Sequence, residues 1–483
     1  MRSFCRVPTW LLLSTLFFAA QPLMAAEITD VADAADTVMI GEVEKEDLFD
    51  FYFTSDFTMV LQNGKITREP INRSWASSNC TSSNARDCLP VDELRYTRTT
   101  NIFNFGGEIG LFHDLSLNLG FHYVISDSEK LRYAKDVNAG SSSVDSDRPL
   151  LPGGGTSYFS VQNGFEAKHA GFGPMDLGLK FGPLNDERDD SKPSWVIYFN
   201  WANPWMARTF NPANRYPTDP TTKALGTPSN PGPVGDGIHR ITFGTSFSKR
   251  IANFGLIGID PNENRRGYID PYMDFSYTLP KAQSGKALAG NITSRPFGRN
   301  PSHQARFSAG MEIVGLEDLK GGRKVSVDLG LCTAYFSEGR NPTLTLPPMG
   351  GACSGQTGEY SMLVDPLGTD TYTEQFMHVG GVLAIYIQAA EFIRFKAGMG
   401  VGYNTGHFLT YEEVGSDGAN GKLRDGQVLC DDPNDQCNPY FSGNDKDGRF
   451  YKEHLPSYDQ IGFRFLDEEH VVFNWFATLM FTF

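Results

Sequence analysis

The sequence predicts an all-β chain that folds as a transmembrane, antiparallel, up-and-down β-barrel of about 12 strands, within a range of about 10 to 14. Segments in which apolar and polar residues alternate recur along the chain, as they do in strands, whose successive side chains point to opposite faces. The connections between these segments are alternately short and long. No apolar run of about 18 residues follows residue 26, so no transmembrane helix is predicted.

The start of the chain has the composition of a cleavable signal peptide. Arg2 and Arg6 precede the apolar run 10–20, and small residues lead to Glu27. We therefore expect residues 1–26 to be removed after Ala26, residues 27–47 to form an acidic periplasmic lead-in, and residues 48–483 to form the barrel. A net charge of −15 argues against nucleic acid as a partner.

Alternation places the strands in order along the chain. It is clearest from Leu115 to Ile125, where apolar residues occupy every second position. The predicted strands are 51–61, 96–111, 115–126, a strand beginning at 176–181, 195–205, 240–248, 270–279, 306–313, 325–332, two strands on either side of 390–391, and 471–483. An even number places both termini in the periplasm.

The connections support the same order. The predicted short turns are 112–114, 317–322 and 390–391, whereas 253–267 is longer than a turn. The predicted long extracellular loops are 67–95, 132–171, 207–237, 338–371 and 409–469. One hairpin more or fewer would give 14 or 10 strands.

The closing segment Val471–Phe483 has one apolar face and one mixed face, and it ends on an aromatic residue. Together with the signal peptide, it resembles the closing strand of bacterial outer-membrane β-barrels. The resemblance implies the outer membrane of a Gram-negative bacterium, contact with its lipid and lipopolysaccharide, and recognition of the Phe483 strand by the barrel-assembly machinery. The alternative is an edge strand of a soluble β-sandwich.

Outward tryptophans are candidates for the aromatic girdles at the two membrane interfaces. Trp195 and Trp205 share one parity, although Pro204 could end the strand and leave Trp201 as the outer anchor. The candidates are Trp195, Trp201, Trp205 and Trp475.

Six cysteines remain after the signal peptide and predict three disulfides. Sequence proximity favours Cys80–Cys88, Cys332–Cys353 and Cys430–Cys437, and the spacings do not fit the rival interpretation of a zinc site. Because Cys332 shares the inward parity, a Cys332–Cys353 bond would fold loop 338–371 into the barrel as a constriction. In the alternative, the strand ends early and both cysteines lie outside.

Inward charged residues are the candidate functional group. The predicted lumen-lining residues are Glu108, Lys180, Arg240, Asp270, Asp274, Arg306, Glu312, Asp328, Arg394 and Lys396. Their alternative role is structural, since opposite charges on neighbouring strands can satisfy one another. A barrel of 12 strands lies between small barrels filled by side chains and large barrels with an open channel.

Other motifs do not predict catalytic, metal or cofactor sites. Gly398–Gly402 alternates inside a strand and opens no helix, unlike a nucleotide-binding loop. The acidic residues of 431–447 lack the first ligand of a calcium-binding loop. No nucleophile or metalloprotease motif is present, although a barrel lipase stays open as an alternative.

The segment Gly171–Phe181 resembles part of the outer-membrane proteins linked to phenol degradation, which are distant relatives of the fatty-acid and aromatic-hydrocarbon transporter barrels. This chain departs from that pattern by inserting Pro174 and Met175. The resemblance implies uptake of small, hydrophobic compounds. We therefore expect an outer-membrane channel or transporter for small molecules. The alternative is a structural or adhesive barrel that acts through its acidic loops, and an enzyme comes third.

Overall fold

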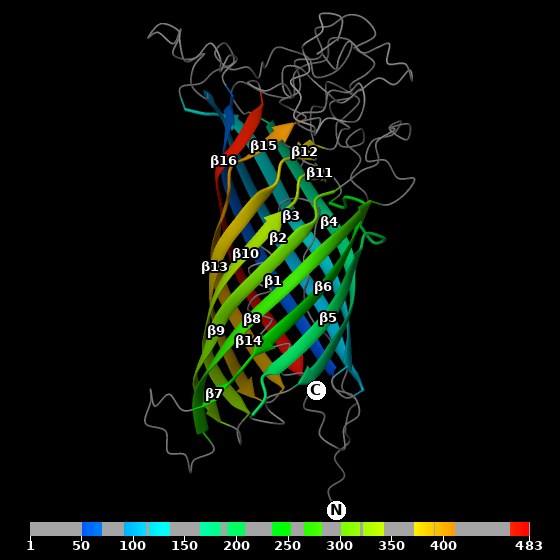
Figure 1. The fold of residues 1–483 in the computed structure, drawn as a ribbon, viewed down its shortest axis with the longest axis vertical. Helices are drawn as coiled ribbons and strands as arrows, with labels where there is room; N and C mark the ends of the chain where they lie inside the picture. The colour runs from blue at the N-terminus through cyan, green and yellow to red at the C-terminus, as the bar shows by residue number, and fades with distance from the viewer. Residues whose placement is uncertain are drawn as a thin grey trace, which may run out of the picture.

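The computed structural model describes residues 51–69, 91–112, 115–135, 165–184, 191–207, 234–252, 265–282, 301–318, 322–341, 371–390, 392–410 and 464–482. Within these ranges the chain forms a closed antiparallel barrel (Figure 1). None of the helices in this part of the chain is long and apolar enough to cross a membrane. The predicted segments 1–26 and 27–47 lie outside the described residues.

Among the described residues, 12 strands form the closed ring, and each pairs with the next in an antiparallel manner. They are β1 (Phe51–Arg68), β2 (Val91–Phe112), β3 (Leu115–Tyr133), β4 (Phe165–Leu184), β5 (Ser194–Asn203), β6 (Ile238–Ser248), β8 (Arg265–Ala282), β9 (Gln304–Asp318), β10 (Arg323–Phe336), β13 (Phe376–Ala390), β14 (Ile393–Asn404) and β16 (Phe465–Thr482). The predicted fold class and strand count are confirmed. We call the end that holds Phe51 and Thr482 the terminal end, and the opposite end the loop end.

Four short strands add to the ring. They are β7 (Ile251–Ala252), β11 (Gly339–Asn341), β12 (Thr371–Thr373) and β15 (His407–Thr410). At the loop end, β15 pairs next to β16 and is followed in the sheet by β12 and β11. Each of these three strands is separated by two residues from a strand of the ring: β15 from β14, β12 from β13, and β11 from β10. The predicted loop 338–371 therefore contains the strand β11.

Several strands are longer than the alternation predicts. β2 has 22 residues and β4 has 20, so the predicted loops 67–95 and 132–171 begin later and end earlier than expected. A strand of about 10 residues already spans the apolar band of a barrel. Beyond that band the outward residues are polar, as at Lys65, and buried inward residues such as Ile66 are apolar. The pattern of apolar outward residues that predicts a membrane strand is therefore lost there.

The two faces of the wall alternate as the sequence predicts. On β16, Val471 and Phe473 face outward with 42% and 38% exposure, whereas Asn474 is fully buried inside. The third strand departs at one point. The pairing register shifts between Asn101 and Ile102, and Ser126 consequently faces outward rather than inward.

The seam between the first and last strands is paired along its length, from Tyr52 opposite Thr482 to Arg68 opposite Phe465. At the loop end, Arg464 donates two hydrogen bonds of 2.8 Å to the Glu69 carboxylate. The Arg68 guanidinium lies 4.9 Å from the centre of the Phe465 ring. No sheet edge is left open at the seam, which is the condition for a closed barrel.

Candidate functional site: the barrel lumen

The structure places all ten candidate charged residues on the inward face of the wall. They do not converge on one point, because they are spread over β2, β4, β6, β8, β9, β10 and β14. The lumen surface as a whole is therefore the candidate site, and each charged residue contributes to one part of it.

Most of the inward charges lie beside an opposite charge. Lys180 lies 3.4 Å from Glu108, across the intervening strand β3. The Lys324 ammonium lies 2.8 Å from Glu312, and Arg306 lies 3.6 Å from Asp274. Further inward contacts join Arg240 to Asp236 at 2.6 Å, Tyr272 to Asp328 at 2.8 Å, and Arg394 to the Tyr52 ring at 5.9 Å.

Paired charges neutralise one another and hold neighbouring strands together, as the structural interpretation of these residues predicts. Lys324 was not among the sequence candidates, although it lies two residues before the inward Ser326 and therefore on the same face of the strand. Asp236 lies ahead of β6, where no alternation points to it. Asp270 and Lys396 are inward and buried.

A chain of polar contacts crosses the seam near the terminal half of the barrel. Thr478 of β16 donates to Asp56 of β1 at 2.8 Å, and the Asn104 amide of β2 donates to the same carboxylate at 2.7 Å. His122 of β3 then lies 3.1 Å from the Asn104 oxygen and contacts Asp176 of β4 through its other ring nitrogen. Five neighbouring strands are therefore tied together by one continuous polar belt.

The geometry of the belt fixes the orientation of the His122 ring. The Asn104 amide group donates to Asp56, so its oxygen faces the His122 Nδ1 atom. The His122 Nε2 atom faces the Asp176 carboxylate. The ring therefore bridges β2 and β4.

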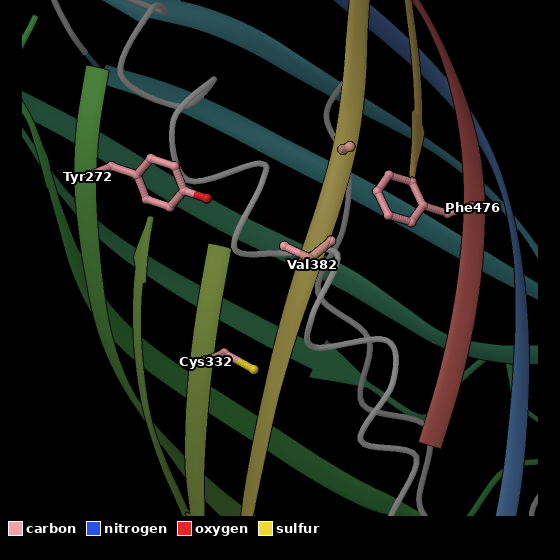
Figure 2. Close-up of a cluster of buried hydrophobic side chains, with 5 residues drawn as sticks. Tyr272, Cys332, Val382 and Phe476 are labelled. Atoms are coloured by element: carbon pink, nitrogen blue, oxygen red, sulfur yellow. The ribbon is translucent and has the colours of Figure 1, made fainter. Parts of the chain in front are cut away.

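One sector of the lumen is apolar. Figure 2 shows Tyr272 of β8, Cys332 of β10, Val382 of β13 and Phe476 of β16, which form a buried cluster with Ala384. Closer to the loop end, Val60, Val472 and Phe376 form a second cluster with Phe336 packed against it. Charged residues lie beside these apolar clusters, since the Tyr272 hydroxyl donates to Asp328 of β10.

The inward position of Cys332 agrees with its parity in the sequence. Its predicted partner Cys353 lies outside the described residues, as do Cys80, Cys88, Cys430 and Cys437. The three disulfides and the constriction therefore stay predictions. The acidic stretch 431–447 also lies outside the described residues.

At the loop end a histidine-rich group lies inside the wall. His470 lies 2.8 Å from Asp467, and His407 of β15 lies 4.0 Å from the same carboxylate. Residues three apart in a regular strand face opposite sides. Here the register shifts opposite Gly64, and Glu469 adopts a left-handed backbone with φ of 51°, so Asp467 and His470 both point inward.

This loop-end group is not a three-ligand metal site. In the part of the chain that the structure describes, no three His, Cys, Asp or Glu side chains are arranged to hold a metal ion together. His407 instead stacks on Phe376, with ring centres 4.2 Å apart, and its Nδ1 lies 3.0 Å from the Thr405 carbonyl oxygen. Its ring therefore joins β15 to β13 and β16.

Acidification should loosen β15. Burial lowers the pKa of His407, and the nearby Asp467 carboxylate offsets this only in part. When β15 comes away from the wall, His407 regains its ordinary pKa of about 6.5 and binds a proton more readily than in the folded state. The stability that the neutral ring gives to β15 is therefore fully present above pH ~6.5 and is lost as the pH falls toward the lower pKa of the folded state. Hydrogen exchange in the peptide containing residues 407–410, corrected for intrinsic rates, should be faster at acidic pH.

The matched variant is His407→Phe, which keeps an aromatic ring against Phe376 and removes the titrating group. Exchange in β15 of this variant should not depend on pH after the same correction. If His407→Phe retained the parental pH dependence, another group would be responsible.

The outer surface of the barrel is apolar between its two ends. Trp195 stacks on Phe247 near the terminal end of β5, with ring centres 5.7 Å apart. β5 ends at Asn203, one residue before Pro204, and Trp205 packs edge-on against Trp201 at 5.5 Å. Trp475 faces outward beside Phe57, 5.2 Å away. Whether these four residues lie at the lipid interfaces stays a prediction.

The exposed exterior of the closed ring is largely aliphatic and aromatic, with Met273, Phe275, Met399 and Val401 each more than half exposed. Its inward face carries most of the polar and charged residues of the strands, together with the apolar clusters described above. A closed barrel leaves no backbone group unpaired in lipid, which is why strands cross membranes in this form. The chain has the fold of a membrane-spanning β-barrel.

No protein-family model matches the chain, and comparison with curated proteins finds no similar sequence. Among solved structures, the barrel is similar to an outer-membrane channel from Pseudomonas putida F1, with 9% identity, a TM-score of 0.33, and coverage of 92% of this chain and 100% of that chain. It is also similar to the transport unit of the autotransporter AIDA-I from Escherichia coli, with 7% identity, a TM-score of 0.36, and coverage of 95% and 97%.

A third similar structure is a FadL homologue from Pseudomonas aeruginosa, with 8% identity, a TM-score of 0.29, and coverage of 89% of this chain and 90% of that chain. The similarity to these three structures is a similarity of fold.

Proposed function

We propose that this outer-membrane barrel is a channel or transporter for small molecules. The observation that carries the proposal is the direction of the hydrogen bonds made by inward side chains of the described residues, which run along the wall to strands one or two places away. The Tyr198 hydroxyl of β5 donates to Asp274 of β8, 3.0 Å away, and the belt from Thr478 to Asp176 follows the wall in the same way.

A lumen in which apolar clusters lie beside charged residues supports a solute with both a polar and an apolar part. The cluster around Val382 and Phe476 offers apolar contact, while the charged residues of β8 and β9 offer hydrogen bonds. This agrees with the small, hydrophobic compounds that the resemblance of Gly171–Phe181 implies. A solute of this kind would exchange water for apolar contacts in one sector without leaving its polar group unpaired.

Single-channel recording of the purified barrel in planar bilayers tests the proposal. The parent barrel should conduct, and a small phenol should reduce the current more than a sugar of similar size. Absence of both conductance and solute-dependent block would contradict the proposal and favour the structural or adhesive alternative.

Charge selectivity provides a second measurement on the same preparation. Lys396→Gln removes an inward positive charge, so the reversal potential under a salt gradient should shift toward cation preference. Lys65→Gln is the matched control, because Lys65 faces outward and pairs with Glu468 at 3.2 Å. Equal shifts in the two variants would show that Lys396 does not face the conducting path.

A further inference from the structure

Large aromatic side chains in the lumen lie directly across from glycines on the neighbouring strand. In three of these pairs the ring covers the place that a β-carbon of the glycine would occupy. They are Tyr198 with Gly244, Tyr272 with Gly310, and Phe476 with Gly398. The glycine therefore forms a recess in the wall that receives the ring.

The pair between β5 and β6 shows this with the least interference from other atoms. A β-carbon built on Gly244 would lie 2.0 Å from Cζ and 2.3 Å from Oη of Tyr198. The three heavy atoms nearest to that position all belong to the Tyr198 ring. The Tyr198 hydroxyl continues past Gly244 to Asp274, at 3.0 and 3.1 Å from its two oxygens.

The same arrangement recurs in the apolar sector of the lumen. A β-carbon on Gly310 would lie 2.5 Å from the Tyr272 hydroxyl, which donates to Asp328 on the strand beyond. A β-carbon on Gly398 would lie 2.5 Å from the end of the Phe476 ring. Figure 2 shows Tyr272 and Phe476 approaching the cluster from opposite sides, with Val382 between them.

We propose that these glycine recesses set the bore of the lumen and therefore the size limit for solutes, an inference that rests on the proposed function. An aromatic ring that cannot lie over a glycine has to rotate away from the wall, and the direction open to an inward side chain is the lumen. Gly244, Gly310 and Gly398 are thus specificity-determining positions, although their own atoms need not touch a solute.

The inference predicts a non-additive effect of two substitutions at Tyr198 and Gly244. Gly244→Ala should displace the ring, lower single-channel conductance and exclude larger sugars that the parent admits in vesicle-swelling assays. Tyr198→Ala alone should change conductance little, because the parental ring already lies against the wall. In the Gly244→Ala background, Tyr198→Ala should restore the lost conductance.

Tyr198→Phe is the matched control, since it keeps the ring over Gly244 and loses the bond to Asp274. Its conductance should stay close to that of the parent. Heat-modifiable migration on gels establishes that each variant is assembled before recording. If Gly244→Ala does not assemble, a large gain of conductance in Tyr198→Ala would still overturn the inference, because it would place the parental ring in the bore.

The outcomes separate this inference from the proposed function. A parent barrel without conductance contradicts the proposed function, and the inference fails with it. A conducting parent whose Gly244→Ala variant behaves identically overturns the inference alone. A loss of conductance that Tyr198→Ala does not reverse also overturns it, because the displaced ring would then not be the obstruction.

Discussion

Met399→Arg should destabilise the barrel by about 2–4 kcal/mol, the cost of an arginine facing lipid near the middle of the bilayer. Met399 faces outward with 52% exposure, midway along β14 between Ile393 and Asn404. Its side chain therefore meets the most apolar part of the membrane, where a guanidinium group has no partner. Denaturant unfolding from phospholipid vesicles measures the loss.

The adjacent variant Gly400→Ser is the control, because Gly400 faces the lumen one residue further along the same strand. It should leave stability almost unchanged. The same contrast applies on β3, where Leu119→Arg places a charge on the outward face. Parental stability of Met399→Arg would show that the face assigned to lipid is wrong.

Arg98→Met should cost about 3–5 kcal/mol, because it leaves the buried Asp127 carboxylate without its charged partner. Arg98 on β2 donates two hydrogen bonds of 2.7 Å to the two Asp127 oxygens on β3. The side chains of both residues are at most 5% exposed. After the substitution, the principal remaining bond to Asp127 comes from Thr100 at 3.1 Å. Denaturant unfolding again provides the measurement.

The double variant Arg98→Met with Asp127→Leu removes both charges and should recover most of the lost stability, since a buried ion pair often contributes little beyond an apolar pair of similar volume. Recovery would assign the cost to the orphaned carboxylate. A double variant as unstable as Arg98→Met would instead assign it to packing around the Arg98 side chain.

Alternation in the sequence determined the fold class, the number of strands and the face of nearly every residue within the apolar band. Outward side chains such as Leu329 meet lipid and inward ones such as Asp328 do not, so the membrane requires a contrast with period two at each crossing. That requirement is local, and it can be read from Leu115–Ile125 or Val471–Phe483 without any knowledge of neighbouring strands.

Beyond the apolar band the same method failed. Toward the loop end the outward residues are charged, as at Arg95, and the buried inward residues include apolar ones such as Leu94. The extensions of β2 to Val91 and of β4 to Phe165 therefore lacked the outward apolar face that marked the rest of each strand. The short strand β11 lies in a predicted loop for the same reason. Bulges could not be predicted from alternation either. The left-handed backbone at Glu469 turns Asp467 and His470 to the same face, although residues three apart in a regular strand face opposite sides.

The tertiary structure alone decided which inward residues meet. Parity placed Lys180, Glu108, Asp274 and Arg306 in the lumen, but their pairing depends on the register between strands, which no single strand encodes. The recess beneath Tyr198 arises in the same way. Gly244 is a small inward residue in the sequence, and it becomes a recess because the register of β5 and β6 sets it directly opposite a tyrosine.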